Sequence, residues 1–261
     1  MRSKLQALRF IQAIGYCYAF TPGPGRLPSL FEVLDTRSDD RRWAWAWDWK
    51  ESLPSEKRVF YGRILARKPT FVSLAFLPHF FALTGNVGEP DDYARLYEAG
   101  RLSALAKRVY EAVAAGGPMT TRQIRAAVEP DRRGSSARLL RALAELQHLL
   151  LLARIGEVGD HPGNYAFVWD LLARWLPDVV GRAARIPHRT AAAAVLGQYV
   201  RITGAPRPED AAALFGWAPS VLAAAIADLR GASMLDLARG PGGEDRLVLR
   251  TTLARLRRAR R

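Results

Sequence analysis

Two segments of the chain carry the same spacing of apolar and polar residues. Residues 139–146 (LLRALAEL) align without a gap on residues 222–229 (LAAAIADL), with apolar side chains at the first, fifth and eighth places and an acid at the seventh. Apolar residues three and four positions apart predict an amphipathic helix in each segment. Each segment follows a shorter helical pattern and precedes a pattern typical of a β-hairpin. Because a helix, a turn, a second helix and a hairpin make up a winged helix-turn-helix, the repeat predicts two such units.

The other elements of the two units follow from caps, turns and periodicity. Ser103 and Ser135 are predicted to cap helices, and turns rich in glycine and proline separate the segments. The first unit is expected to have three helices and two strands at residues 103–116, 122–128, 135–148, 149–155 and 165–169. The second unit is expected to have three helices and two strands at residues 188–203, 208–215, 218–230, 234–237 and 246–250.

Residues 1–100 predict a different arrangement. Helices are expected at residues 3–14, 28–34, 52–65 and 77–84, and strands at residues 43–50 and 69–74. A polar connector rich in turn residues follows at 86–100 and marks a domain boundary. We therefore predict a mostly α protein with short β wings. An N-terminal α/β region (1–100) with a Trp-rich strand precedes a winged helix (101–185) and a second winged helix with a basic C-terminal tail (186–261).

The Trp-rich segment has an indole at every second position, namely Trp43, Trp45, Trp47 and Trp49. In a strand this alternation would place all four indoles on one face. Such a face could stack bases or a flat ligand, with Asp48 and Lys50 alongside and Tyr61 lining the same cleft. The alternative is that the indoles fill a core against neighbouring helices, and the sequence leaves both open.

Charge is distributed unevenly along the chain. The formal net charge is +14, and arginine supplies 34 of the 39 cations. Residues 1–100 hold 14 basic and 11 acidic side chains, whereas residues 101–261 hold 25 and 14. The excess lies with the repeated units, where it predicts a surface for a polyanion. Arginine binds phosphate through two parallel hydrogen bonds, which favours double-stranded DNA as the partner. A gene composition rich in arginine and alanine codons is the alternative explanation.

The longer helix of the first unit is the better candidate for reading DNA. Its expected buried stripe is Leu139, Leu143 and Leu146, and polar residues gather near its N-terminus, where recognition helices contact DNA. The predicted contacts with bases and phosphates in and before this helix are Arg132, Arg133, Ser135, Ser136, Arg138 and Arg141. A solvated arginine face on an ordinary helical hairpin is the alternative.

The corresponding helix of the second unit is a poorer reader. Its exposed positions include Ala218, Ala223 and Ala224, which can neither bond a base edge nor neutralise a phosphate. We therefore expect the second unit to act as a packing platform. The arginine-rich tail, with Arg257 and Arg258, is predicted to be an arm on the DNA backbone, or else a solubilising terminus.

Signatures of metal, cofactor or nucleophilic chemistry are missing from the sequence. The histidines at 79, 148, 161 and 188 lie far apart, with no cysteine or carboxylate at the spacing of metal ligands. The glycine-rich turns fit neither a phosphate loop nor a nucleophile elbow. The sequence therefore predicts no metal and no cofactor.

The single cysteine, Cys17, excludes an internal disulfide and is typical of a reducing compartment. It lies in an apolar run at residues 14–20, which predicts a buried structural thiol. No apolar segment approaches the roughly 18 residues that a membrane span needs. We therefore expect a cytoplasmic protein without a membrane partner.

Three features together resemble the AlkZ/YcaQ-type family of winged-helix DNA glycosylases, and in particular its shorter, uncharacterised relatives. They are the tandem winged-helix pattern, the segment ALTGNVG at residues 82–88 and the segment WDWK at residues 47–50. The resemblance implies that tandem winged helices hold duplex DNA. It further implies that a Gln-apolar-Gln or Gln-apolar-Asp motif positions the water that hydrolyses the bond to an alkylated base.

The chain departs from that motif. None of its glutamines (Gln6, Gln12, Gln123, Gln147 and Gln198) stands two residues before a Gln or Asp. In the segment Ala46-Trp47-Asp48 an alanine takes the place of the first glutamine. Asp48 is therefore the candidate catalytic residue, because a cationic alkylated base is already an activated leaving group and one carboxylate could suffice.

Three functions are compatible with this sequence. The first is a duplex DNA-binding repair protein related to AlkZ that excises alkylated bases, with Asp48, Trp45, Trp47, Trp49 and Tyr61 at the lesion-facing end. The second is a winged-helix transcription regulator with an effector or dimerisation module at residues 1–100. Such a regulator would prefer one operator by about a thousandfold or more. The third is a winged-helix scaffold for protein partners, which would have no salt-dependent affinity for DNA.

Overall fold

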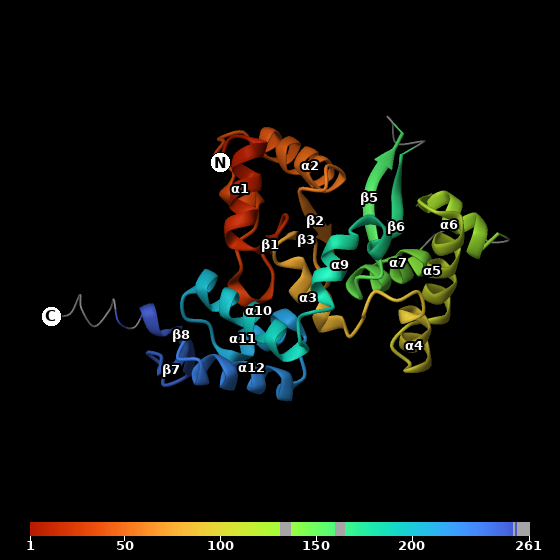
Figure 1. Ribbon diagram of the computed structural model, residues 1–261. Helices are drawn as coiled ribbons and strands as arrows, with labels where there is room; N and C mark the ends of the chain where they lie inside the picture. The colour runs from red at the N-terminus through yellow and green to blue at the C-terminus, as the bar shows by residue number, and fades with distance from the viewer. Residues whose placement is uncertain (131–136, 160–164, 253, 255–261) are drawn as a thin grey trace.

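Helices dominate the molecule, and short strands lie between them (Figure 1). The computed structural model describes residues 1–130, 137–159, 165–252 and 254, and within these residues the strands form three small antiparallel sheets. The prediction of a mostly α protein with short β segments is confirmed.

The first sheet lies beneath the N-terminal helix. Helix α1 (Lys4–Ile14) leads into β1 (Tyr16–Tyr18), which pairs with β3 (Thr70–Ser73), and β3 pairs with β2 (Val59–Gly62). Cys17 on β1 is fully buried among apolar side chains from α1, β2 and β3, as the sequence predicts. Burial raises the pKa of its thiol well above the ordinary value.

The Trp-rich segment is a helix, α2 (Asp39–Ser55), so the predicted strand at residues 43–50 is wrong. Two local signals outweigh the alternation of the indoles. The Ser38 side chain accepts a hydrogen bond from the backbone of the first turn and caps the helix. Asp39 and Asp40 lie in that first turn, where the helix dipole favours negative charge.

The helix divides the four indoles between two faces, because residues four positions apart are neighbours on a helix. Trp43 and Trp47 lie on the outer face and are 48% and 52% exposed. Trp45 and Trp49 stack with ring centroids 5.6 Å apart, and Trp49 is buried. The core interpretation therefore holds for the pair that packs inward, and stacking of bases or a flat ligand on the exposed pair stays a prediction.

The helix expected at residues 52–65 is also wrong. Residues of this range end α2, form β2 and enter a short 3-10 helix, η3 (Leu65–Arg67). Tyr61 consequently lies on a strand of the first sheet. The strand expected at 69–74 is confirmed by β3, and the helix expected at 77–84 is confirmed by α3 (Leu77–Thr84), which ends at Gly85 with a left-handed φ of 82°.

The middle of the chain forms a second helical group with the second sheet. Its elements are α4 (Asp92–Glu98), α5 (Ala104–Gly116), β4 (Met119–Thr120), α6 (Thr121–Val128), α7 (Ala137–His148), β5 (Leu152–Val158) and β6 (Ala166–Leu171). The order of strands is β4-β6-β5. Leu139, Leu143 and Leu146 are buried on the inner face of α7, which confirms the predicted stripe.

The last part of the chain forms a third group, whose final helices and hairpin lie lowest in Figure 1. Its elements are α8 (Leu172–Trp175), α9 (Pro177–Ala183), α10 (His188–Thr203), α11 (Pro208–Phe215), α12 (Pro219–Gly231), β7 (Leu235–Arg239) and β8 (Asp245–Leu249). Helix α12 packs along α10, and β7 pairs with β8. Two further 3-10 turns, η1 (Pro24–Arg26) and η2 (Phe31–Val33), belong to the N-terminal part.

One hydrophobic core joins the N-terminal sheet to the third group. Tyr16 and Phe60 belong to the same buried cluster as Val195 and Leu214. The hydroxyl of Tyr16 donates a hydrogen bond of 2.7 Å to the carbonyl of Val195, deep in that cluster. The boundaries predicted at residues 100 and 185 therefore separate elements that share a core, and the three-domain division stays a prediction.

Candidate nucleic-acid interface

A cleft of about 450 Å³ lies where the N-terminal part meets the middle group. We call it the α2–α7 cleft. Helix α2 and strand β2 supply one wall, and helix α7 and the β5–β6 hairpin supply the other. Its lining residues are Phe20, Trp47, Lys50, Tyr61, Arg63, Pro69, Leu140, Arg141, Leu143, Ala144, Gln147, Arg154, Phe167 and Trp169. The volume falls within the roughly 300–1,000 Å³ of small-molecule sites.

The inner wall of the cleft contains a buried group of charges. Lys50 and Arg154 are 3% and 8% exposed, and both pair with the carboxylate of Glu51. The Arg154 Nη2 atom lies 3.0 Å from Glu51 Oε2, while Lys50 Nζ pairs with Oε1. Helix α2 supplies two of these residues and strand β5 the third, so the ionic group ties the two walls together.

Burial shifts the pKa values of these charged side chains and of the neighbouring Tyr61. Loss of solvent lowers the pKa of Lys50, and its hydrogen bond to Glu51 opposes that shift. Loss of solvent raises the pKa of Glu51, while the charge of Arg154 lowers it. Burial also raises the pKa of Tyr61 to about 12, so its phenol stays neutral.

Aromatic rings of the cleft lie against these buried cations. Lys50 Nζ lies 3.6 Å from the centroid of the Trp47 ring. The guanidinium carbon of Arg154 lies 4.7 Å from the Tyr61 centroid and 4.4 Å from the Phe167 centroid. These distances are within the range of cation–π attraction. The rings and cations thus form one packed wall.

At the rim of the cleft, polar contacts join the end of β2 to α7. The side chain of Gln147 is buried, and its Oε1 accepts a hydrogen bond of 3.1 Å from the backbone N–H of Arg63. His148 Nδ1 lies 3.3 Å from the carbonyl oxygen of Arg63. Burial lowers the pKa of His148, and the nearby charge of Arg67 lowers it further. These contacts hold the backbone of Arg63 at the mouth of the cleft, and its side chain is exposed there.

The exposed side of α7 carries arginines without acidic partners. Arg138 and Arg141 are exposed, and neither forms an ion pair with any residue that the structure describes. The nearest acid of the helix, Glu145, is already engaged, because it accepts hydrogen bonds from the backbone N–H and hydroxyl of Ser103 at 2.6 and 2.7 Å. The two guanidiniums are therefore available to an external anion.

Among the predicted site residues, the structure brings Arg141, Trp47 and Tyr61 to the α2–α7 cleft, and Arg138 lies one turn from Arg141 on α7. Trp49 is buried and Trp45 half-buried, so neither lines the cleft. The predicted DNA contacts Arg132, Arg133, Ser135, Ser136, Arg257 and Arg258 lie outside the described residues.

Asp48 does not line the cleft but a neighbouring hollow that shares Trp47 with it. It is exposed and lines a shallow outer hollow together with Trp43, Ala44, Trp47, Glu51 and Glu157. Glu51 is bound to Lys50 and Arg154, and Glu157 accepts a hydrogen bond from the hydroxyl of Tyr165. Within the described ranges Asp48 has neither an ion pair nor a side-chain hydrogen bond, so its carboxylate is the available one in this hollow.

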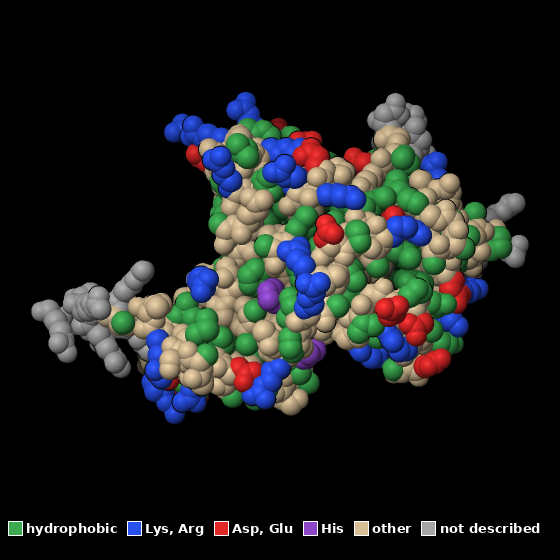
Figure 2. Space-filling view, viewed as in Figure 1, with side chains coloured by type: hydrophobic (Ala, Val, Ile, Leu, Met, Phe, Trp, Pro, Cys, Tyr) green, Lys and Arg blue, Asp and Glu red, His purple; other side chains and the backbone are tan. Residues whose placement is uncertain are grey.

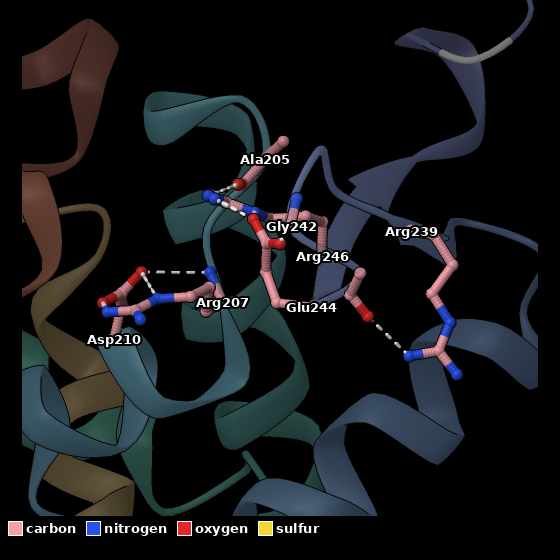
Figure 3. A network of polar contacts seen from close by, with 8 residues as sticks. Ala205, Arg207, Asp210, Arg239, Gly242, Glu244 and Arg246 are labelled. Carbon is pink, nitrogen blue, oxygen red and sulfur yellow. Dashed lines mark hydrogen bonds and ion pairs between the residues drawn. The ribbon is translucent and has the colours of Figure 1, made fainter.

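Several arginines of the third group differ, because the protein's own acids hold them (Figure 3), and acidic side chains lie beside basic ones in the lower part of Figure 2. Arg207 pairs with Asp210 at 2.8 Å, and Arg246 pairs with Glu244. These contacts lower the pKa of both Asp210 and Glu244. Further pairs join Arg239 to Asp245 at 3.1 Å and Arg189 to Asp228. Paired arginines offer less charge to a phosphate, which agrees with the expectation of a packing role for this group.

Sequence reasoning placed Lys50 alongside the predicted indole face but missed Glu51 and Arg154. Lys50 ends the segment that alternation predicted as a strand, Glu51 directly follows that segment, and Arg154 stands in a predicted strand far along the chain. An acid directly after a lysine is an ordinary surface pattern, so only the packing of α2 on β5 reveals that both are buried. The one available signal was Ser38 with two following aspartates, which marks the start of a helix.

The described part of the chain contains no group of three or more His, Cys, Asp or Glu placed to hold a metal ion. None of its helices combines the length and the apolar character that crossing a membrane requires.

The fold and the cleft define a mostly helical protein with small antiparallel sheets and an aromatic, cation-lined cleft between helix α2 and helix α7. The model of the AlkZ-related family matches residues 1–216, and the chain belongs to that family. Among solved structures it is similar to the Streptomyces sahachiroi DNA glycosylase AlkZ, with 16% identity and a TM-score of 0.49. That match covers 76% of this chain and 54%, about half, of the other. No curated protein sequence matches the chain.

Proposed function

We propose that the protein binds duplex DNA in the repair of damaged bases. Its membership of the AlkZ-related family supports this proposal, since AlkZ is a DNA glycosylase. The single observation that carries it is the pair of arginines on α7, beside an aromatic cleft, that form no ion pair with any described residue. Exposed guanidiniums favour phosphate, and a cleft walled by aromatic rings favours a base turned out of the duplex.

We assign the middle group as a winged helix. Its elements follow the order helix, strand, helix, helix and hairpin, and its sheet has the order β4-β6-β5. In that arrangement α7 is the recognition helix and β5–β6 the wing. The third group has the related order α10, α11, α12 and a two-stranded hairpin, and we assign it as the second winged helix. Its acid-bound arginines favour packing over DNA contact.

Asp48 is our candidate for assisting base release. Glycosidic cleavage develops positive charge on the sugar, and a carboxylate near that sugar stabilises it. Trp47 lines both the cleft and the outer hollow that contains Asp48, so a sugar at the edge of that indole would lie between the two. The base would then occupy the cleft while the carboxylate addresses the sugar.

The test is the double variant Arg138→Ala, Arg141→Ala. Its affinity for a random duplex should fall, and the slope of log Kd against log salt should decrease by about one per lost phosphate contact. The matched control is Arg9→Ala, Arg185→Ala, which removes the same charge from exposed positions outside the cleft and outside α7. Equal salt slopes for the two double variants would contradict α7 as the DNA-binding helix. A thousandfold preference for one operator would instead identify a transcription regulator.

A further inference from the structure

The basic and the acidic side chains around Trp47 line different hollows. The described residues that line the α2–α7 cleft include four cations, Lys50, Arg63, Arg141 and Arg154, and no acid. The acids of this region line the outer hollow instead, which shares Trp47 with the cleft. Glu51 neutralises part of the charge of Lys50 and Arg154, but it lines the outer hollow and not the cleft. The groups that face an occupant of the cleft therefore carry positive charge.

The aromatic faces of the cleft are already engaged by these cations. Lys50 lies over Trp47, and Arg154 lies between Tyr61 and Phe167. A cation on one face of an aromatic ring is attracted by the ring quadrupole, and this weakens the attraction of the same ring for a second cation on its other face. These rings can still stack on a flat uncharged partner, because stacking depends on contact area.

We infer that the α2–α7 cleft takes an uncharged nucleobase and rejects a cationic, ring-alkylated one. This inference rests on the proposed function, and it specifies the chemical class of the base. The exposed Arg63 and Arg141, from opposite walls, suit the phosphates that flank such a base. The buried Lys50 and Arg154 face the base itself, in surroundings that screen a like charge poorly.

The same cations fit the chemistry of an uncharged base. When its glycosidic bond is hydrolysed, the bond between C1′ and nitrogen breaks and the electron pair stays on the base. Water adds to C1′, and the proton that this water loses is finally taken up by the base. The departing base is negatively charged until that proton arrives, and Lys50 and Arg154 would stabilise the charge. A cationic base becomes neutral when the glycosidic bond breaks, so Lys50 and Arg154 would not stabilise it as a leaving group.

The experiment compares two duplexes that differ by one charge. One carries 7-methylguanine, which is cationic, and the other carries 7-deaza-7-methylguanine, its uncharged isostere, at the same position opposite cytosine. Binding is measured by fluorescence anisotropy on the full chain at slightly acidic pH, where the first base keeps its charge. The uncharged base should bind about tenfold more tightly. Equal affinities, or tighter binding of the cationic base, would overturn the inference.

A variant links the preference to the cleft. Lys50→Gln removes one inner cation and should reduce the preference for the uncharged base at least about threefold. Arg9→Gln on α1 removes the same charge elsewhere and should leave the preference unchanged. A retained preference in folded Lys50→Gln would show that the cleft does not set it.

The two proposals fail in different ways. Absence of salt-dependent binding to both duplexes would refute DNA binding itself, and this inference with it. Binding of both duplexes without preference for the uncharged base would refute the inference alone. The comparison on the unaltered protein needs no substitution, so poor folding of a variant cannot decide the outcome.

Discussion

Arg154 Nη2 lies 3.0 Å from Glu51 Oε2 and joins strand β5 to helix α2. Both side chains are almost fully enclosed, and Lys50 completes the group. Because the two elements form opposite walls of the α2–α7 cleft, this contact holds the walls at a fixed separation. The stability of the fold and the shape of the cleft therefore depend on the same carboxylate.

Glu51→Ala should destabilise the protein by about 3 kcal/mol, because it leaves two buried cations without their counter-ion. The free energy of unfolding is measured by urea denaturation followed by circular dichroism. Glu98→Ala removes an exposed acid at the end of α4 and should change stability by less than about 0.5 kcal/mol. A similar small change for Glu51→Ala would mean that the ionic group contributes little.

Substitution of two tryptophans of α2 should have different effects on stability and on DNA affinity. Trp49→Ala opens a cavity in the core and should cost about 3–5 kcal/mol. Trp47→Ala removes a half-exposed indole from the cleft wall and should cost about 1 kcal/mol or less. Affinity for a duplex carrying an extruded base should fall about tenfold in Trp47→Ala, since a stacking platform is lost. If Trp47→Ala binds this duplex as tightly as the unaltered protein, Trp47 does not stack on the extruded base.

Stability should decrease as the pH falls below neutrality. Burial lowers the pKa of His148 and of His79 below the ordinary value of 6.5, so the unfolded chain binds protons that the folded chain does not. The resulting stability is present above pH 6.5 and is lost as the pH falls through the folded-state values. His148→Gln should flatten this dependence, measured as urea midpoints across the acidic range. An unchanged slope would exclude His148 as a contributor.

Asp48→Asn should abolish release of a damaged base from duplex DNA, while leaving duplex affinity unchanged. The reason is that the amide retains the shape of the side chain but cannot stabilise positive charge on the sugar. Release is followed by chromatography of the free base. Asp40→Asn makes the same change near the start of α2, outside the outer hollow, and should release base normally. Release at the unaltered rate in Asp48→Asn would remove this residue from the mechanism.

Periodicity predicted the middle of the chain well because there it reports burial directly. Leu139, Leu143 and Leu146 recur at helical spacing and lie on the inner face of α7. The same is true of the caps, since Ser103 accepts a hydrogen bond from the backbone of α5 as expected. Where an element has one buried face and a standard cap, local sequence is sufficient.

The alternation of the indoles led to a wrong prediction for α2, because the four indoles lie on two faces of one helix, an inner face and an exposed face. Their spacing of two has the period of a strand, but it also contains two pairs at a spacing of four. The helix uses those pairs, with Trp45 on Trp49 inside and Trp43 beside Trp47 outside. The charged inner wall of the cleft could not be predicted, since Lys50 and Arg154 meet only through the packing of distant elements.

Cys17 gives the molecule a built-in reporter of its own opening. It is the single thiol of the chain, and it is wholly enclosed beside the first sheet. A modifying reagent in solution can reach the sulfur only when α1 and the sheet separate. The rate at which mass is gained during a pulse of reagent therefore measures how often that N-terminal layer comes apart, without any engineered label.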